Sequence, residues 1–181
     1  RFTLWSWGHN AYGQLGDGTL LDKSSPTQDF TEASNWSAIS VGMSHKVALK
    51  SDGTLWAWGL NEWGKLGDGT VVNKSVPTQE STGATDWSSV AVGGYHTVAL
   101  KSYGTLWAWG RNEYGQLGDG TTIDRNVSVQ IRSSGVVAVS ASGSNRFSLF
   151  LETNGSLQGM GLNLNGELGV GDTTQRLTPT N

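Results

Sequence analysis

The sequence has no cysteine, and charged residues make up only 15% of its 181 residues. The lack of cysteine excludes disulfides, thiolate metal ligands and a cysteine nucleophile, while leaving the cellular compartment undetermined. No apolar run approaches the roughly 20 residues that cross a bilayer, so no membrane partner is expected. Helical patterns are also nearly missing, because no stretch places apolar residues at the three- and four-residue spacing of an amphipathic helix.

Positive charge is scarce as well. The formal net charge is −3, and the twelve Lys and Arg residues are scattered along the chain. Binding to nucleic acid needs Lys and Arg side chains that neutralise phosphates. We therefore expect no nucleic-acid partner.

Glycine and tryptophan are abundant instead, with 26 and nine residues. Many of them belong to a string that occurs four times, the last copy being degraded: residues 3–19, 54–70, 105–121 and 156–171. The glycine at a fixed place in this string recurs every 51 residues, at Gly8, Gly59, Gly110 and Gly161. A constant period of this size indicates a repeat architecture, and the chain holds about 3.5 periods.

Each period divides into four short β-strands. In the period that begins at Trp36, strands are expected at 37–41, 45–50 and 54–58, followed by a proline-containing strand at 76–79. Asp52-Gly53 predicts a two-residue hairpin turn in which both residues have positive φ, so the second and third strands should be antiparallel neighbours. The proline cannot donate a ladder hydrogen bond, which places the fourth strand at a sheet edge.

Four antiparallel strands in each period of about 50 residues describe one blade of a β-propeller. We therefore predict an all-β fold, a single propeller segment over residues 1–181 with about 3.5 four-stranded blades. The repeats are placed approximately at 1–35, which gives a half blade, and at 36–86, 87–135 and 136–181.

These residues resemble the regulator of chromosome condensation repeat family. The resemblance rests on Trp7 to Gly18, on Pro26, and on Val41 to Leu49 followed by Gly53, and it covers essentially the whole chain. It implies a propeller that is usually seven-bladed. Activities in the family range from guanine-nucleotide exchange on a small GTPase to ultraviolet sensing and inhibition of secreted enzymes, so the fold alone does not identify a function.

Two of those activities find little support in the residues. The catalytic residues of the exchange factor have no counterpart that can be placed in this sequence. The photoreceptor's Gly-Trp-Arg-His-Thr motif is only faintly echoed by Gly94-Tyr-His-Thr97, which lacks its Trp and Arg. The resemblance therefore argues for a fold more strongly than for either activity.

Six of the nine tryptophans form Trp-x-Trp pairs, such as Trp56 and Trp58. Alternate positions on a strand share one face, and we predict that these rings pack between neighbouring blades rather than bind a ligand. Trp63 matches Tyr12 and Tyr114 in the loop after the Trp strand. It is expected to face outward, where it is a candidate for binding.

The histidines suggest structure rather than chemistry. His45 and His96 are 51 residues apart, but Phe147 takes the third position, which a metal site would not tolerate. We expect buried histidines that donate to a neighbouring turn. No Gly-x-Ser-x-Gly motif appears, and neither histidine has an evident triad partner. The sequence therefore predicts no catalytic residue, no cofactor and no enzyme activity.

The loop after each Trp strand carries one Asp and one Asn. A single carboxylate in each repeat, as at Asp68, falls short of the 6–8 oxygen ligands of Ca²⁺, so no metal site is expected. We expect these carboxylates to cap backbone N–H groups instead. The asparagine recurs in all four copies, as at Asn61, and is expected to bond the turn backbone so that the following glycines can fold tightly.

The same loops differ at certain positions, and residues 9, 60, 111 and 162 read His, Leu, Arg and Leu. Such loops gather on one rim of a propeller, where a scaffold recognises its partners. Neutral drift in solvated loops explains the variation equally well. The candidate partner-binding residues are Tyr12, Glu62, Trp63, Arg111, Glu113 and Tyr114.

The Trp strand occurs four times, whereas the two strands that precede it occur three times. Three whole blades and an outer half cannot close a ring, so both ends should expose apolar faces. We expect a longer parent protein to supply the remaining strands and to close the ring by strand addition. Closure by self-association of two chains is the alternative.

Our functional hypothesis is a non-catalytic scaffold that binds a protein partner through its rim loops. The competing hypothesis is a carbohydrate- or surface-binding module, extracellular or on a virion, that uses Tyr12, Trp63 and Tyr114. Guanine-nucleotide exchange is a third and weakest hypothesis. The sequence does not indicate a compartment.

Overall fold

The computed structural model describes residues 2–144 and 146–181, and almost all of its regular structure is β. The first sheet, called the half blade, pairs β1 (Trp5–Gly8) with β2 (Lys23–Gln28). The first blade contains β3 (Trp36–Val41), β4 (His45–Lys50), β5 (Leu55–Gly59) and β6 (Lys74–Gln79), and the 3₁₀ turn η1 (Glu62–Gly64) follows β5.

The second blade contains β7 (Trp87–Val92), β8 (His96–Lys101), β9 (Leu106–Gly110) and β10 (Arg125–Arg132). The third blade contains β11 (Val136–Ala141), β12 (Phe147–Glu152), β13 (Leu157–Gly161) and β14 (Arg176–Thr180). Every strand pair is antiparallel. The predicted fold of about 3.5 propeller blades is confirmed.

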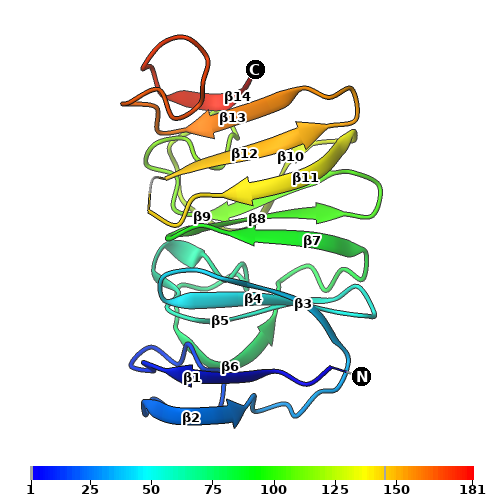
Figure 1. Cartoon of the computed structure of the whole chain (residues 1–181), viewed down its shortest axis with the longest axis vertical. Helices are drawn as coiled ribbons and strands as arrows, with labels where there is room; N and C mark the ends of the chain where they lie inside the picture. Colours follow the sequence, from blue (N-terminus) through cyan, green and yellow to red (C-terminus); the bar gives the residue numbers. More distant parts are fainter. Residues whose placement is uncertain (1, 145) are drawn as a thin grey trace.

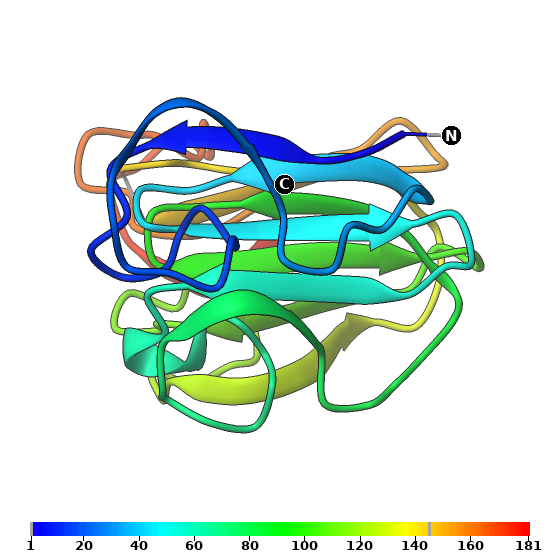
Figure 2. The ribbon, with the colours of Figure 1, turned by 90° about the horizontal axis from the view of Figure 1, so that it is seen from below.

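The sheets are stacked along the long axis of the molecule, from β1 and β2 at the bottom of Figure 1 to β14 at the top. Strand β7 packs against β3 and β4, and β11 packs against β7 and β8, so the first strands of successive blades are neighbours. Seen from below in Figure 2, the strands run from side to side, and η1 lies with the loop after β1 at one end. We call this end of the blades the loop rim.

The hairpin between β4 and β5 differs from its prediction. The strands are antiparallel neighbours as expected, but Asp52 does not have a positive φ; Gly53 alone in the turn does, at 78°. The Gly53 N–H donates to the Lys50 carbonyl at 3.0 Å, and Lys50 N–H donates to the Thr54 carbonyl at 3.0 Å. The loop therefore has three residues with glycine last, the arrangement in which one left-handed residue suffices.

The proline-containing strands lie at sheet edges, as predicted. Pro26 is in β2, and Pro77 is in β6, the outermost strand of the first blade. An edge strand can leave one N–H position unpaired without breaking a ladder between two neighbours, which explains why proline is tolerated there.

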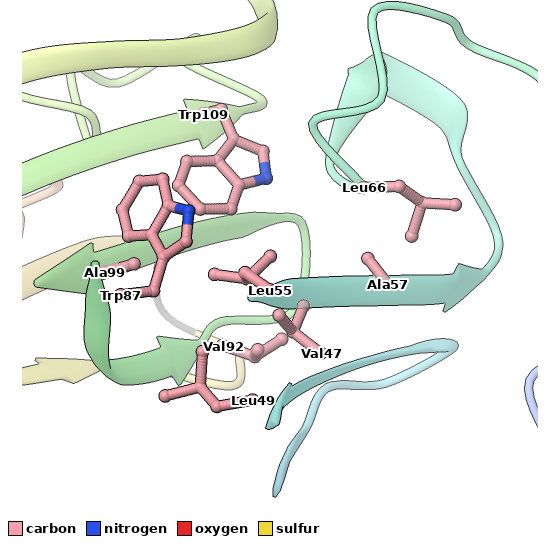
Figure 3. Close-up of a cluster of buried hydrophobic side chains, with 9 residues drawn as sticks. All are labelled: Val47, Leu49, Leu55, Ala57, Leu66, Trp87, Val92, Ala99 and Trp109. Atoms are coloured by element: carbon pink, nitrogen blue, oxygen red, sulfur yellow. The ribbon is translucent and has the colours of Figure 1, made fainter. Parts of the chain in front are cut away.

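The hydrophobic core lies between the blades. One cluster joins Val47 and Leu55 of the first blade to Trp87 and Trp109 of the second, and Figure 3 shows these side chains facing one another across the gap between the two sheets. Trp58 and Trp109 are each 0% exposed. The prediction that Trp-x-Trp rings pack between blades is thus confirmed for Trp58 and Trp109, whereas the first pair does not fit it, because Trp5 and Trp7 are exposed.

Each of these tryptophans is covered by the loop of the preceding blade. Gly67 in the loop after β5 has φ of 73°, and a Cβ there would come within 2.7 Å of the Trp109 ring nitrogen. Only glycine permits both this backbone conformation and this close approach. The Trp109 indole N–H then donates to the Lys65 carbonyl at 3.0 Å. The glycines therefore let the loop backbone itself form the interface between blades.

Candidate functional site

The loops of the rim are built on a buried asparagine. Asn61 accepts a hydrogen bond from the Leu66 N–H at 3.0 Å, and its amide donates to the carbonyls of Thr70 and Val72 at 3.1 Å. Its equivalents are buried to the same degree: Asn10, Asn112 and Asn163. One amide thus holds both ends of the loop, which confirms the prediction that it bonds the turn backbone.

The aspartate of each loop completes this framework. Asp68 accepts hydrogen bonds from the Thr70 N–H at 3.0 Å and the Asn61 amide at 3.1 Å, and it pairs with Lys74 at 3.3 Å. Burial would raise the pKa of Asp68, but these hydrogen bonds outweigh it and hold the pKa below the usual value. The predicted capping role is confirmed, and the carboxylate supports the loop from within.

The two histidines link neighbouring blades. His45 is 0% and His96 is 1% exposed, so the prediction of burial is confirmed. Their partners, however, are hydroxyls on the next blade rather than a turn: His96 Nε2 lies 2.8 Å from Ser148 Oγ, and His45 Nε2 lies 3.5 Å from Thr97 Oγ1. The turn glycines Gly42 and Gly93 do lie against the His45 and His96 rings, but the hydrogen-bond partner of Nε2 is in each case the hydroxyl of the next blade.

The hydroxyl groups determine which histidine nitrogen is protonated. Ser148 Oγ donates its proton to the Gln116 carbonyl at 2.9 Å, so it can only accept from His96 Nε2. Burial lowers the pKa of His96 to about 4. The imidazole is therefore neutral and carries its proton on Nε2 at neutral pH.

The rim carries a cluster of aromatic and charged side chains that comes from three blades. Trp63 and Lys65 follow β5, and Tyr95 precedes β8; Arg111, Glu113 and Tyr114 follow β9, and Arg146 precedes β12. We call these seven residues the rim cluster. Four of the six sequence candidates belong to it: Trp63, Arg111, Glu113 and Tyr114. The loops that contribute them lie at the left of Figure 1, on the side of η1.

Trp63 is the centre of one half of the cluster. Its ring meets that of Tyr95 edge to face, with centroids 5.3 Å apart. The Arg111 guanidinium carbon lies 4.5 Å from the Trp63 ring centroid and 5.5 Å from that of Tyr95. A guanidinium at this distance is attracted by the negative face of the ring. Two blades are thus joined on the rim by a cation–π contact.

Arg146 is the centre of the other half. Its guanidinium donates to the Tyr114 hydroxyl at 2.9 Å and lies 5.0 Å from the Tyr114 ring centroid. The Glu113 carboxylate forms an ion pair with Arg111 and lies 3.9 Å from Arg146. The two arginines therefore share one carboxylate, whose side chain remains 48% exposed.

Lys65 is the buried member of the rim cluster, with 0% of its surface exposed. Its Nζ lies 5.7 Å and 5.6 Å from the ring centroids of Trp63 and Tyr95, and it has no hydrogen-bond acceptor within residues 2–144 and 146–181. Burial lowers the pKa of Lys65 to about 8, although the nearby Glu62 carboxylate opposes the shift. An ammonium group is thus buried without a bonded anion.

The lysine changes the loop around it. In the first and third loops the equivalent glutamines, Gln14 and Gln116, accept the backbone N–H of Tyr12 and Tyr114 at 2.9 Å. A lysine cannot accept a hydrogen bond. Trp63, at the corresponding place, has φ of 65°, the left-handed region that L-residues avoid. The departure from the repeat pattern is therefore confined to the loop that carries Trp63.

A hollow of about 610 Å³ adjoins Trp63. Two carboxylates and two amides contribute to its lining, which contains Glu62, Trp63, Val71, Asn73, Asp124 and Asn126. Glu62, the fifth sequence candidate, thus belongs to this hollow. Trp63 thus lines an acidic hollow and also contacts the cationic part of the rim cluster through Arg111.

Tyr12 is the sequence candidate that the structure places elsewhere. It is 40% exposed, and its ring contacts His9 edge to face with centroids 6.2 Å apart. Ser44 stands where the later blades have Tyr95 and Arg146, so the first loop has neither an aromatic nor a cationic partner from the next blade at that position. The predicted set of three exposed rings is therefore not one surface.

Sequence reasoning missed Lys65, Tyr95 and Arg146. The signal was present, because positions 44, 95 and 146 read Ser, Tyr and Arg, and positions 14, 65 and 116 read Gln, Lys and Gln. The same variability brought attention to Arg111. Only the structure shows that these variable positions meet across the boundary between blades.

Two other kinds of site are not found where the structure describes the chain. Residues 2–144 and 146–181 contain no group of three or more His, Asp or Glu side chains that could hold a metal ion. The same residues form no helix that is long and apolar enough to cross a membrane. The chemistry of the rim therefore comes from rings, guanidinium groups, an ammonium group and carboxylates.

The fold and its repeated loops define a β-propeller repeat protein. A sequence profile of the regulator of chromosome condensation (RCC1) repeat matches residues 3–49, 52–100 and 103–151, and a second profile of the same repeat matches 87–116. The chain belongs to the RCC1 repeat family.

Three similar proteins illustrate the family. The chain is 34% identical over 177 residues to the ultraviolet-B receptor UVR8 of Arabidopsis thaliana, covering 96% of this chain and 40% of the receptor. Human WBSCR16 superimposes with a TM-score of 0.82 at 25% identity, over 99% of this chain and 47% of that one. Yeast RCC1 (Prp20), solved bound to Kap60, gives 0.83 at 22% identity, over 99% and 44%. The chain thus spans less than half the length of each.

Proposed function

We propose that this chain is a non-catalytic repeat scaffold that binds a protein partner through the rim cluster. The observation that carries the proposal is the assembly of Trp63, Tyr95, Arg111, Tyr114 and Arg146 from three blades into one partly exposed group. Trp, Tyr and Arg are the residues that most often dominate protein–protein binding energy. Yeast RCC1 was solved in complex with the protein Kap60, which supports a protein ligand for this type of propeller.

The non-catalytic part of the proposal is supported by the state of the histidines. Of the three histidines, His45 and His96 are buried between sheets, and the exposed His9 has its Nδ1 against the Gln14 amide at 2.8 Å. The Nε2 proton of His96 is already committed to Ser148. A general base must instead be within reach of a proton on the substrate.

The proposal can be tested by selecting phage-displayed peptides on the folded chain. The counter-selection uses the double variant Trp63→Ala/Arg111→Leu, in which position 111 carries the residue found at positions 60 and 162. We expect enriched peptides that bind the unaltered chain and lose at least about tenfold in affinity for the double variant. Tyr12→Ala, the same position in the first loop, is the matched control and should bind normally. If the enriched peptides bind the double variant as tightly as the unaltered chain, the proposal is wrong.

The hollow beside Trp63 favours a second candidate, a carbohydrate-binding module. An aromatic wall with a few amide and carboxylate groups is a common lining of small-ligand sites. A glycan array separates the two candidates. Reproducible glycan binding that is lost in Trp63→Ala and kept in Arg111→Leu would favour the carbohydrate reading over the scaffold.

Self-association stays a separate prediction. Trp7 is 60% exposed, whereas its equivalents Trp58 and Trp109 are fully buried beneath a neighbouring loop. An exposed apolar face of this kind favours contact with another blade. Light scattering over a wide concentration range should show a mass that rises with concentration, and a smaller rise for Trp7→Ser.

A further inference from the structure

We infer that the rim cluster is a receptor for an acidic segment of a partner protein, and that a carboxylate of that segment binds across Arg111 and Arg146 above the buried Lys65. The inference rests on the proposed function and names the chemistry of the partner.

The charge of the cluster is opposite to that of the chain. Lys65, Arg111 and Arg146 lie around the rings of Trp63, Tyr95 and Tyr114. Glu113 pairs with the two arginines and Glu62 lies near Lys65, so three cations face two carboxylates. The whole chain has a net charge of −3. A local excess of positive charge on an otherwise acidic protein steers an anionic group to this part of the rim.

Glu113 shows how a carboxylate is held at the site. It pairs with Arg111 and approaches Arg146 to 3.9 Å, so one carboxylate bridges residues from the second and third blades. Its side chain is 48% exposed, against 19% for Arg111 and 29% for Arg146. Exposed pairs of this kind contribute little to stability, so Glu113 can leave at low cost. A partner carboxylate would take its place.

The buried Lys65 is evidence for an anion site that does not depend on the arginines. Its ammonium group is fully buried, points at the rings of Trp63 and Tyr95, and has no acceptor in the described part of the chain. A buried charge without a hydrogen-bonded ion destabilises the folded protein, and the nearby Glu62 carboxylate offsets this only in part, because burial still lowers the pKa of Lys65. An anion bound on the arginines above it would lower that penalty, because electrostatic attraction acts strongly over short distances where water is excluded.

The backbone is strained at the same place. Three non-glycine residues of the described chain have positive φ: Glu32, Trp63 and Arg146. Trp63 and Arg146 are both members of the rim cluster, at 65° and 52°. Such strain persists where surrounding contacts enforce it, and it gathers at binding sites. The strain therefore coincides with the cations and the rings.

The occupant is a carboxylate rather than a phosphate or a nucleic acid. A carboxylate is the anion that the two arginines already bind, in the form of Glu113. Nucleic acid would meet the acidic groups at the edge of the cluster, Glu62 and Asp124 in the neighbouring hollow. Extended contact with a phosphate backbone needs many basic side chains in a row, which this rim does not supply.

The experiment measures fluorescence anisotropy with three labelled probe peptides. One is rich in glutamate, the second has glutamine at each glutamate position, and the third has phosphoserine there. We expect the glutamate peptide to bind at least about tenfold more tightly than the glutamine peptide, and the difference to shrink in high salt. Tighter binding of the phosphoserine peptide would overturn the assignment to a carboxylate.

Four variants locate the binding. Lys65→Gln and Arg111→Leu introduce residues found at the same positions of other repeats. Each should lower the affinity for the glutamate peptide by about tenfold. Glu113→Ala introduces the residue found at position 11 and should raise the affinity for the glutamate peptide several-fold, because it frees both arginines. Lys101→Gln removes a lysine that lies over Trp87 and Trp107 at the other end of β8, and it should change nothing.

Misfolding of the variants would not explain affinity changes of opposite direction. Weaker binding by Lys65→Gln together with stronger binding by Glu113→Ala follows only if the site binds an anion. Equal binding of the glutamate and glutamine peptides would overturn the inference. If selected peptides still depended on Trp63 and Arg111 in that case, the scaffold proposal would stand and only the acidic partner would be wrong.

Discussion

The contacts between blades and the contacts on the loop rim use the backbone and the side chain of the same residue, yet only the rim contacts differ from repeat to repeat. Between the blades, Trp58 donates to the Gln14 carbonyl at 3.1 Å and Trp109 donates to the Lys65 carbonyl at 3.0 Å. The geometry is the same although the accepting residues are Gln and Lys. On the rim, the side chains of those two residues meet different neighbours.

The difference shows how a repeat can be conserved in structure and variable in chemistry. The interface uses the carbonyl of residue 14 or 65, and a carbonyl is present whatever the side chain is. The side chain at that position is then free to change. Gln14 bonds the Tyr12 N–H, whereas Lys65 brings a buried charge beneath Trp63 and Tyr95. Backbone contacts hold neighbouring blades together, and side chains give each boundary between blades its own surface.

The largest effect is expected from breaking the interface between blades. Trp109→Ala removes a fully buried ring and its indole hydrogen bond, and should lower the free energy of unfolding by about 3–5 kcal/mol. Trp7→Ala, at the equivalent but exposed position, should cost less than about 1 kcal/mol. Urea unfolding followed by circular dichroism measures both. Similar losses for the two variants would contradict the role given to the covering loop.

The histidine contacts make the same interface sensitive to pH. Burial lowers the folded-state pKa of His96 to about 4, below its ordinary value of 6.5, so the unfolded chain binds the proton more readily. Stability is therefore fully present above about pH 6.5 and is lost as the pH falls toward 4, by up to about 3 kcal/mol from this residue. The aspartates with lowered pKa values add a further loss of stability as the pH falls below their ordinary pKa of 3.8.

The pH prediction is checked by urea unfolding between pH 7 and pH 4. His96→Phe, which carries the residue of position 147, is the matched control. The stability of this variant should depend less steeply on pH over that range, even if it is lower at pH 7. Equal slopes for the variant and the unaltered chain would show that His96 does not titrate as described.

A smaller effect of opposite sign is expected on the rim. Lys65→Gln removes an unpaired buried ammonium group and supplies an acceptor for the Trp63 N–H, so it should raise the free energy of unfolding by about 1–3 kcal/mol. Gln14→Lys, the reverse change in the first loop, should lower it by a similar amount. Thermal unfolding of the two variants provides the comparison. Loss of stability in Lys65→Gln would mean that the lysine is better paired than its contacts indicate.

Most of the fold could be predicted from the sequence. The 51-residue period, the proline at the fourth strand and the recurring asparagine each predicted a feature that the structure has, because repeated local interactions leave repeated local signals. The turn at Asp52 was predicted wrongly, since Asp-Gly fits both a two-residue turn and the last two places of a three-residue loop. The predicted hydrogen-bond partners of the histidines were also wrong, because the hydroxyls that they contact belong to another blade.

The candidate site could be predicted only in part, for a physical reason. Trp63, Arg111, Glu113 and Tyr114 come from loops whose variable positions are visible in the sequence. Lys65, Tyr95 and Arg146 are equally variable, but their importance depends on which loops touch when the sheets stack, and that contact is made across blades. Local periodicity thus determined the blades and loops, whereas packing between blades decided which side chains became neighbours.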